Sequence, residues 1–499
     1  MAWFAQRPRL LALILVIVAS IRIVATYRVL SHTTDEPAHL AAGIEWIQNG
    51  TYTYEDQHPP LARVTGALGL YLTGSRWTHN KDMYMEGFLL LGQGKRYNRA
   101  LFYSRLFMLP YFWIGAMAVY LWAFRIGGGG TAVLATLLFT TTPPILAHAG
   151  LATTDMALTA FVSATLVASL YWADKPGWRR SLCFGLLLGL ALLSKFSSLA
   201  FLPTAWLCMI AVYLIRGNSA RRAFALLPWA ALSALVAALV ICAGYQFAPA
   251  PFFSGIDYVL AHNRVGHLSY LLGHLSKTGF WYYYPVVLAV KTPIATLILL
   301  GLAIAFTFRR IAMPLAFVAA ILAVGLFSHI NIGVRHILPI YTGFAICAGV
   351  ALDGLFRSSR RWLVGIGAVL VLWQVATGAL MHPDYIAYTN ELAGKHPERI
   401  LADSDLDWNQ GMRGLALRLQ ELGVKDLTFK LSSSGYMIAD GHSFPHYTEM
   451  PDGDKPNPGW NAVSVTAWKL SGQPRWAERI EPTERIRHSI YLYYFTPPK

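Results

Sequence analysis

Charged residues are scarce in this chain. Asp, Glu, Lys and Arg make up only 13% of its 499 residues, whereas hydrophobic residues make up 55% and the mean hydropathy is +0.43. Soluble domains contain about 25% charged residues. The deficit excludes an ordinary soluble chain and indicates that about half of the residues lie in lipid.

Cysteine is scarce as well, and its placement excludes a second class of protein. The four cysteines all fall inside strongly apolar stretches, at Cys183, Cys208, Cys242 and Cys347. The polar segments therefore have no disulfide framework, and no cysteine shows the spacing of a zinc site.

Apolar stretches long enough to cross a bilayer recur along the first 380 residues. A spanning helix needs about 20 mostly apolar residues. We predict an all-α polytopic membrane protein with about eleven transmembrane helices, near 10–30, 101–124, 129–147, 152–173, 181–195, 197–215, 223–247, 284–307, 311–328, 336–355 and 361–380. The first follows Arg7 and Arg9 and is expected to be an uncleaved anchor rather than a signal peptide. The apolar stretch at 61–73 is too short to span and is expected to lie at the interface or to re-enter.

The basic charge balance predicts an orientation. With the N-terminus in the cytoplasm, the short inner loops hold fourteen Lys or Arg residues against only Asp174 and Asp353. The rest of the chain holds 27 of the 41 Lys and Arg residues and 24 of the 26 Asp and Glu residues, so its charge is nearly balanced. Cationic inner loops are the rule in membrane proteins. The net charge of +15 thus reflects topology, and a nucleic-acid partner loses its main support.

Three long segments are then predicted outside: 31–100, 248–283 and 381–499. The first opens with Asp35-Glu36-Pro37, typical of a helix start, and its helix should end at Asn49-Gly50 and lie on the outer membrane surface. Residues 1–380 form the predicted transmembrane domain. Residues 381–499 form a small extracytoplasmic α/β domain, with a helix at 408–423 and strands at 426–431, 462–468 and 489–495.

Ionisable residues inside or beside spans are costly and therefore mark candidate functional sites. Here they lie towards the predicted outer ends of several spans: Arg22, Asp155, Lys195, Lys291, Arg335 and His336. Each has a structural alternative, because Arg22 and Lys195 can extend to the headgroups and Asp155 can cap a helix. Their shared depth nevertheless favours a polar cavity open to the outer face.

Two carboxylates stand at the start of the first outer loop. Asp35 or Glu36 can act as a general base facing a membrane-embedded substrate, or can simply cap a helix. Further on, two prolines follow His58 and fix the directions of His58 and Arg63. The acidic run at 403–407 resembles a metal-binding motif. It lacks the Gly and the Glu that a calcium loop has at its sixth and twelfth positions. The similar motif of sugar-nucleotide enzymes needs a cytoplasmic nucleotide sugar, whereas this segment is predicted outside. No metal ligand is therefore assigned.

Together these motifs resemble a known family. Thr34-Asp35-Glu36, His58-Pro59-Pro60-Leu61, Thr154-Asp155, Leu193-Ser194-Lys195-Phe196 and Lys291-Thr292-Pro293 are similar to motifs of GT-C glycosyltransferases. Bacterial homologues of protein O-mannosyltransferases and of lipid A aminoarabinose transferases are the most similar. The resemblance covers about residues 1–380, and 403–410 is similar to a motif in the outer tail of one bacterial branch.

The resemblance implies an inverting enzyme of the bacterial inner membrane that takes a sugar from a polyprenyl-phosphate donor to an extracytoplasmic protein, lipid or glycan. It implies that Asp35 is the catalytic residue, with Glu36 and Asp155 beside it. Gln57-His58 replaces the Glu-Lys of the aminoarabinose transferases, so a divalent metal stays unsupported and no cofactor is assigned.

Cations are also needed for the departing phosphate. The candidate substrate-binding residues are His58, Arg63, Lys195, Arg264, Lys291, Arg335 and His336. The alternatives are a transporter or flippase of lipid-linked sugars, and a non-catalytic envelope assembly protein.

Overall fold

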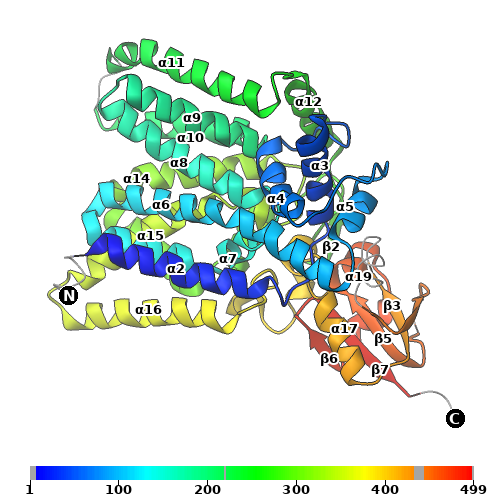
Figure 1. Cartoon of the computed structure of the whole chain (residues 1–499). Coiled ribbons are helices and arrows are strands. Elements are labelled where there is room, and N and C mark those ends of the chain that lie inside the picture. The colour runs from blue at the N-terminus through cyan, green and yellow to red at the C-terminus, as the bar shows by residue number, and fades with distance from the viewer. Residues whose placement is uncertain (1–6, 218–220, 432–442, 454, 497–499) are drawn as a thin grey trace.

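The computed structural model describes residues 7–217, 221–431, 443–453 and 455–496. Its long helices lie side by side, and a small sheet domain formed by the end of the chain sits at one end of them (Figure 1). We call this end of the bundle the domain side.

Seven helices of the described chain are long and apolar enough to cross a membrane. They are α2 (Pro8–Thr26), α6 (Gly94–Thr141), α8 (Asp155–Asp174), α10 (Ser198–Ile215), α11 (Arg221–Gly244), α14 (Ile294–Leu326) and α16 (Arg361–Leu380). The shorter α9 (Trp178–Ser194) and α15 (Ile340–Phe356) pack among them. The prediction of an all-α membrane domain is confirmed.

Two of these helices each cover two of the predicted spans. α6 is broken at Gly128, whose φ of 77° lies in the left-handed region, and α14 is broken at Thr307. Glycine adopts such a φ without the steric cost that a Cβ brings. Each kink lies at the boundary between two predicted spans, so two predicted spans correspond to one kinked helix in each case.

The first outer loop folds into three helices on the domain side: α3 (Glu36–Asn49), α4 (Pro60–Leu72) and α5 (Met83–Leu91). The predicted start and the stop at Gly50, whose φ is 67°, are both found. Residues 36–45 of α3 are all buried, and the helix packs on α4 and α5, so over these residues it presents no open apolar face to lipid. Gly43 lets α4 approach so closely that a Cβ there would stand 2.3 Å from the carbonyl oxygen of Arg63.

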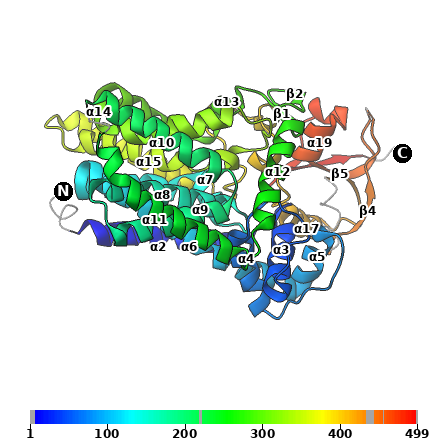
Figure 2. The same ribbon diagram turned by 90° about the horizontal axis from the view of Figure 1, so that it is seen from above.

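Short elements complete the domain side. α7 (Pro143–Ala149) precedes α8, and α12 (Ala250–Val265) leads to the hairpin β1 (Ser269–Leu271) and β2 (His274–Ser276). α13 (Tyr283–Lys291) precedes α14, and the 3-10 turn η1 (Val334–Ile337) precedes α15. Figure 2 shows α12 crossing between the bundle and the sheet domain.

The tail forms a five-stranded mixed sheet in the order β4-β3-β5-β7-β6. Its strands are β3 (Asp426–Lys430), β4 (His446–Glu449), β5 (Gly459–Ser464), β6 (Glu484–Ile486) and β7 (Ile490–Phe495). The α/β prediction is confirmed, but the strand predicted at 462–468 ends at Ser464. There the Ser464 side chain caps α19 (Val465–Ser471) by accepting from the N–H of Ala467. The predicted helix at 408–423 is α17 (Met412–Glu421).

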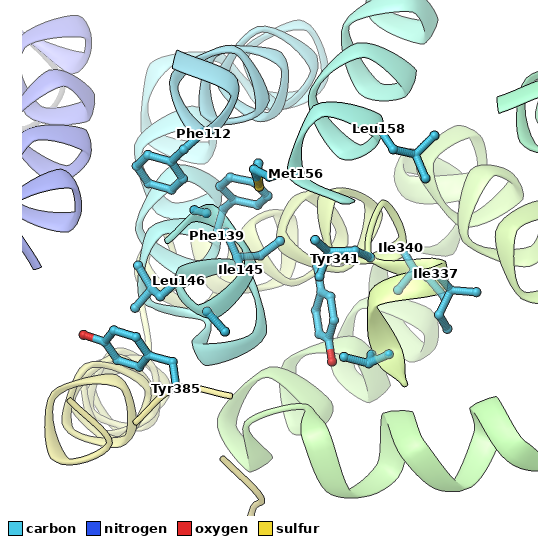
Figure 3. Packing of buried hydrophobic residues seen from close by; sticks show 14 of the residues in the cluster. Phe112, Phe139, Ile145, Leu146, Met156, Leu158, Ile337, Ile340, Tyr341 and Tyr385 are labelled. Atoms are coloured by element: carbon cyan, nitrogen blue, oxygen red, sulfur yellow. The ribbon is translucent and has the colours of Figure 1, made fainter. Parts of the chain in front are cut away.

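Short 3-10 turns connect the bundle to this sheet: η2 (Glu391–Ala393), η3 (Pro397–Arg399) and η4 (Asp403–Asp405), with η5 (Arg475–Glu478) after α19. One hydrophobic core continues from the helices into this segment and includes Tyr385 and Trp408. Figure 3 shows part of it, with Phe112 and Phe139 of α6 and Tyr385 of the tail. Burial of shared apolar surface therefore fixes the tail on the domain side.

The charge distribution predicts which side of the membrane this is. In a background without the native cysteines, Ser359→Cys lies in the exposed turn between α15 and α16, and Ser471→Cys lies at the exposed end of α19. We expect an impermeant thiol reagent to label Cys at 471 and to spare Cys at 359 in intact cells, because cationic loops stay inside. The opposite labelling pattern contradicts the orientation.

Candidate active site

Asp35 is the last residue before α3, and its side chain points away from the helix. It makes no capping hydrogen bond. Its Oδ2 instead accepts a hydrogen bond from Nη1 of Arg335 at 2.9 Å. The Asp35 side chain is 27% exposed, whereas that of Arg335 is 8% exposed. The capping alternative is therefore not what the structure shows, and Asp35 presents a carboxylate to solvent.

Arg335 lies in η1 and contacts three residues besides Asp35. Its Nη1 is 4.0 Å from Oδ2 of Asp155, and its Nε donates to Oγ of Ser404 at 3.1 Å. The guanidinium also lies 4.1 Å from the ring centroid of Trp408. Residues from α3, α8 and the tail thus meet at one buried cation.

Lys195 and Asp155 form a second, more deeply buried pair. Nζ of Lys195 donates to Oδ1 of Asp155 at 2.7 Å, and Asp155 is fully buried. Asp155 begins α8, and Lys195 follows the end of α9, so both stand at the domain-side ends of their helices. Lys195 is therefore held inside the protein rather than extended to lipid headgroups. Two cations and two carboxylates alternate in a chain from Lys195 to Asp35.

Glu36 has a different environment from its neighbour. Both of its oxygens accept from the guanidinium of Arg105, at 2.9 and 2.8 Å, and they also accept from the N–H groups of Thr33 and Ala152. Burial alone would raise the pKa of Glu36, but Arg105 and these hydrogen bonds bring it below its usual value. The fully engaged carboxylate corrects the prediction that Glu36 is catalytic: it anchors the start of α3.

His58 and Arg63 both contact His39 of α3 and are tied to each other. Nη2 of Arg63 is 3.2 Å from Nδ1 of His58, and Arg63 also pairs with Glu55. Burial, together with the nearby charge of Lys195, lowers the pKa of His58 to about 3. His58 is thus a neutral imidazole. The guanidinium of Arg63 is occupied by its own loop, which speaks against its predicted role as a phosphate ligand.

Two further imidazoles border the site. His336 lies in η1, as predicted, and His148 ends α7 with its ring 6.2 Å from that of Trp408. Nε2 of His336 and Nδ1 of His148 are buried, and neither has a hydrogen-bond partner among the described residues. Burial and, to a smaller extent, the charge of Lys195 lower the pKa of His336. Burial lowers the pKa of His148 to about 4. Unpaired buried nitrogens are costly, so these two imidazoles hold unused hydrogen-bonding capacity next to the charged cluster.

Three predicted cations lie apart from this cluster. Nζ of Lys291 donates to the carbonyl oxygens of Ile386 and Asp405, at 2.7 and 2.6 Å, so it holds the tail rather than a phosphate. Arg22 donates to the carbonyl of Gly378 in α16. Arg264 is exposed near the end of α12.

Residues 403–410 of the tail form one wall of the site, which sequence reasoning had not anticipated. The N–H groups of Ser31 and Thr34 donate to the carbonyls of Gln410 and Trp408, at 3.1 and 3.2 Å. The side chain of Asn409 donates to Oγ1 of Thr34 at 2.8 Å. These bonds place the tail directly beside the segment that ends in Asp35.

The carboxylates of Asp405 and Asp407 within this wall are structural. Asp405 accepts from the N–H of Val334 at 2.9 Å and from the hydroxyl of Tyr283 at 3.2 Å. Asp407 accepts from the hydroxyl of Ser464 and the N–H of Thr466. Within the described ranges, no group of three or more His, Cys, Asp or Glu side chains is arranged to hold a metal ion.

The chain is similar to known proteins in part of its sequence and in its fold. Residues 84–245 match the family described as dolichyl-phosphate-mannose-protein mannosyltransferase. Solved structures of ArnT from Cupriavidus metallidurans, apo and bound to undecaprenyl phosphate, align over 98% of this chain and 99% of theirs, with TM-scores of 0.53 and 0.55 and identities of 13% and 14%. The chain has the GT-C glycosyltransferase fold.

A second solved structure shares this GT-C fold. The archaeal oligosaccharyltransferase AglB from Archaeoglobus fulgidus, in complex with an inhibitory peptide and a dolichol-phosphate, aligns over 94% of this chain and 72% of its own, with a TM-score of 0.50 and 11% identity. A search of curated proteins returned no matching relative.

The two adjacent carboxylates predict opposite mutational effects on stability. Glu36→Gln breaks a buried pair and leaves Arg105 without its counter-charge, so we expect a loss of about 3–5 kcal/mol in the free energy of unfolding. Asp35→Asn removes a partly exposed carboxylate and leaves Arg335 with Asp155 and Ser404, so its cost should be clearly smaller. Thermal unfolding of both variants in detergent measures this, and equal shifts contradict the assignment of Glu36.

Proposed function

We propose that this protein transfers a sugar from a polyprenyl-phosphate donor to an acceptor hydroxyl outside the cytoplasm. One observation carries the proposal: the partly exposed carboxylate of Asp35 stands beside Arg335 at the domain-side end of a GT-C bundle. The match to dolichyl-phosphate-mannose-protein mannosyltransferases supports the sugar-transfer class, and the fold shared with an ArnT structure bound to undecaprenyl phosphate supports the lipid carrier.

The residues suit the chemistry of a phosphate-linked donor. The donor already carries its leaving group, so the protein must supply a base for the acceptor and cations for the departing phosphate. In the proposed step, the acceptor oxygen attacks the anomeric carbon while its proton passes to Asp35. The bond from that carbon to the phosphate oxygen breaks, and polyprenyl phosphate leaves with the electron pair. A single direct attack inverts the anomeric centre.

Arg335 and Lys195 are the proposed phosphate ligands. The neighbouring imidazoles of His58, His148 and His336 have lowered pKa values, so at neutral pH they add no positive charge. Lys195 is held on Asp155, whereas Arg335 is shared between Asp35 and Asp155. A phosphate beside Arg335 competes with Asp35 for the guanidinium, and binding of the donor therefore releases the base.

A flippase fits this arrangement less well. Transporters place their substrate and ion sites near the bilayer midplane, between halves that move against each other. Here Asp155 stands at the first residue of α8 and Lys195 just after the end of α9, both on the domain side.

Loss of the base should abolish transfer. We expect Asp35→Asn to lower the rate by about 10²–10⁴-fold while the protein still inserts and folds. The assay follows polyprenyl phosphate released from a panel of labelled polyprenyl-phosphate sugars, with an envelope extract of the source organism as the acceptor mixture. Near-normal turnover of this variant removes Asp35 from the reaction.

Loss of a phosphate ligand should weaken binding of the carrier. A hydrogen bond to a charged group contributes about 1.5–3 kcal/mol, so Lys195→Met should weaken the affinity for undecaprenyl phosphate by roughly 10–100-fold. Lys195→Arg keeps the charge beside Asp155 and should therefore lose less of the affinity for undecaprenyl phosphate than Lys195→Met. The matched control is Arg264→Met, which removes an exposed cation of α12 and should bind normally. The reverse order of effects contradicts the assignment.

A further inference from the structure

One side chain stands out in the tail segment that lines the site. Every residue from 401 to 412 is buried except Asp403, which is partly exposed. Its carboxylate accepts one hydrogen bond among the described residues, from the N–H of Ser404 at 2.6 Å. The mechanism above does not use this carboxylate, and Asp405 and Asp407 nearby are fully engaged.

The two residues that follow Asp403 are bonded to η1 and to the residues around it. The hydroxyl of Ser404 donates to the carbonyl of Ile332 and accepts from Nε of Arg335. Asp405 accepts from the N–H of Val334 and, through its own carbonyl, from Lys291. These bonds place residue 403 beside the guanidinium that binds Asp35.

Asp403 has a strained backbone conformation, which the contacts of its neighbours hold in place. Its φ is +55°, in the left-handed region that asparagine and aspartate tolerate better than other residues with a Cβ. Such conformations persist where surrounding contacts enforce them, and they cluster at functional sites. The strained backbone therefore suggests that the direction of the Asp403 side chain serves a function.

The electrostatics agree with a place inside the site. Burial raises the pKa of Asp403 to about 7, against the opposing effect of Arg335 and with a smaller contribution from the charge of Asp35. Arg335 in turn is stabilised in its charged form by Asp35, Asp155 and Asp403. Asp403 thus interacts with the same cation as the proposed base.

We propose that Asp403 is a further carboxylate of the reaction site, supplied by the tail, which accepts a hydrogen bond from the acceptor's hydroxyl group and directs that group towards the donor. This rests on the proposed function. It assigns the tail a place in acceptor binding and commits the acceptor to a hydroxyl-bearing molecule. The ionised carboxylate is the form that accepts from a hydroxyl without also donating, so transfer requires deprotonated Asp403.

Two variants separate this role from a structural one. Asp403→Asn keeps the shape and the tolerance of positive φ, and Asp403→Gly removes the side chain while relieving the strain, so both should fold at least as well as the parent. Asp426→Asn, at an exposed carboxylate of β3, is the control. The assay measures transfer to the envelope extract between pH 5.5 and 8.5, together with binding of undecaprenyl phosphate.

In the parent protein, transfer should rise with pH through about 7, because Asp403 is protonated below that value and ionised above it. Both Asp403 variants should lose tenfold or more of the rate at pH 8, lose that rise, and bind undecaprenyl phosphate within twofold of the parent. The Asp426 control should match the parent throughout.

Other outcomes overturn the proposal in distinguishable ways. An Asp403→Asn variant with the parent's rate and pH profile shows that Asp403 has no part in transfer, while the proposed function stands. Impaired binding of undecaprenyl phosphate places Asp403 on the donor side and refutes the acceptor assignment. A parent protein that releases polyprenyl phosphate from none of the sugars refutes the proposed function, and this inference with it.

Discussion

The ion pair between Arg335 and Asp35 is the interaction on which the arrangement of the site depends. Arg335 is 7% exposed and Asp35 faces solvent, so the pair joins the buried framework to the accessible surface. Asp155 and Ser404 hold the same guanidinium from α8 and from the tail. A buried guanidinium needs such partners, because an unpaired charge in a low-dielectric interior is very costly. Segments more than 300 residues apart are thereby brought to one point.

Two neighbouring carboxylates show how the fold separates structure from chemistry. Glu36 is fully buried and bound by Arg105, whereas Asp35, one residue earlier, turns outward to Arg335. A carboxylate saturated by donors stays ionised but has no lone pair left for a substrate proton. Asp35 keeps an accessible oxygen beside a cation that a phosphate can also bind. Glu36 thus fixes the start of α3, and Asp35 just before it is left for chemistry.

Much of the fold could be predicted from the sequence, because apolar length and turn residues are local signals. The spans, the start of α3 and its stop at Gly50 follow from them, and so does the shared depth of Asp155, Lys195 and Arg335. The position of the tail beside Asp35 could not be predicted. Its bonds to residues 31–34 join distant parts of the chain and leave no periodic pattern. The direction of a side chain is equally invisible, so Lys291 was assigned to phosphate although it binds two backbone carbonyls.

A structure of the protein with bound polyprenyl phosphate tests the central claim most directly. The account predicts phosphate oxygens within hydrogen-bond distance of Arg335 and Lys195, and an Asp35 carboxylate that has moved away from Arg335 towards the space beside the phosphate. A phosphate bound at Lys291 or Arg264, with the Asp35–Arg335 pair still at 2.9 Å, would contradict it.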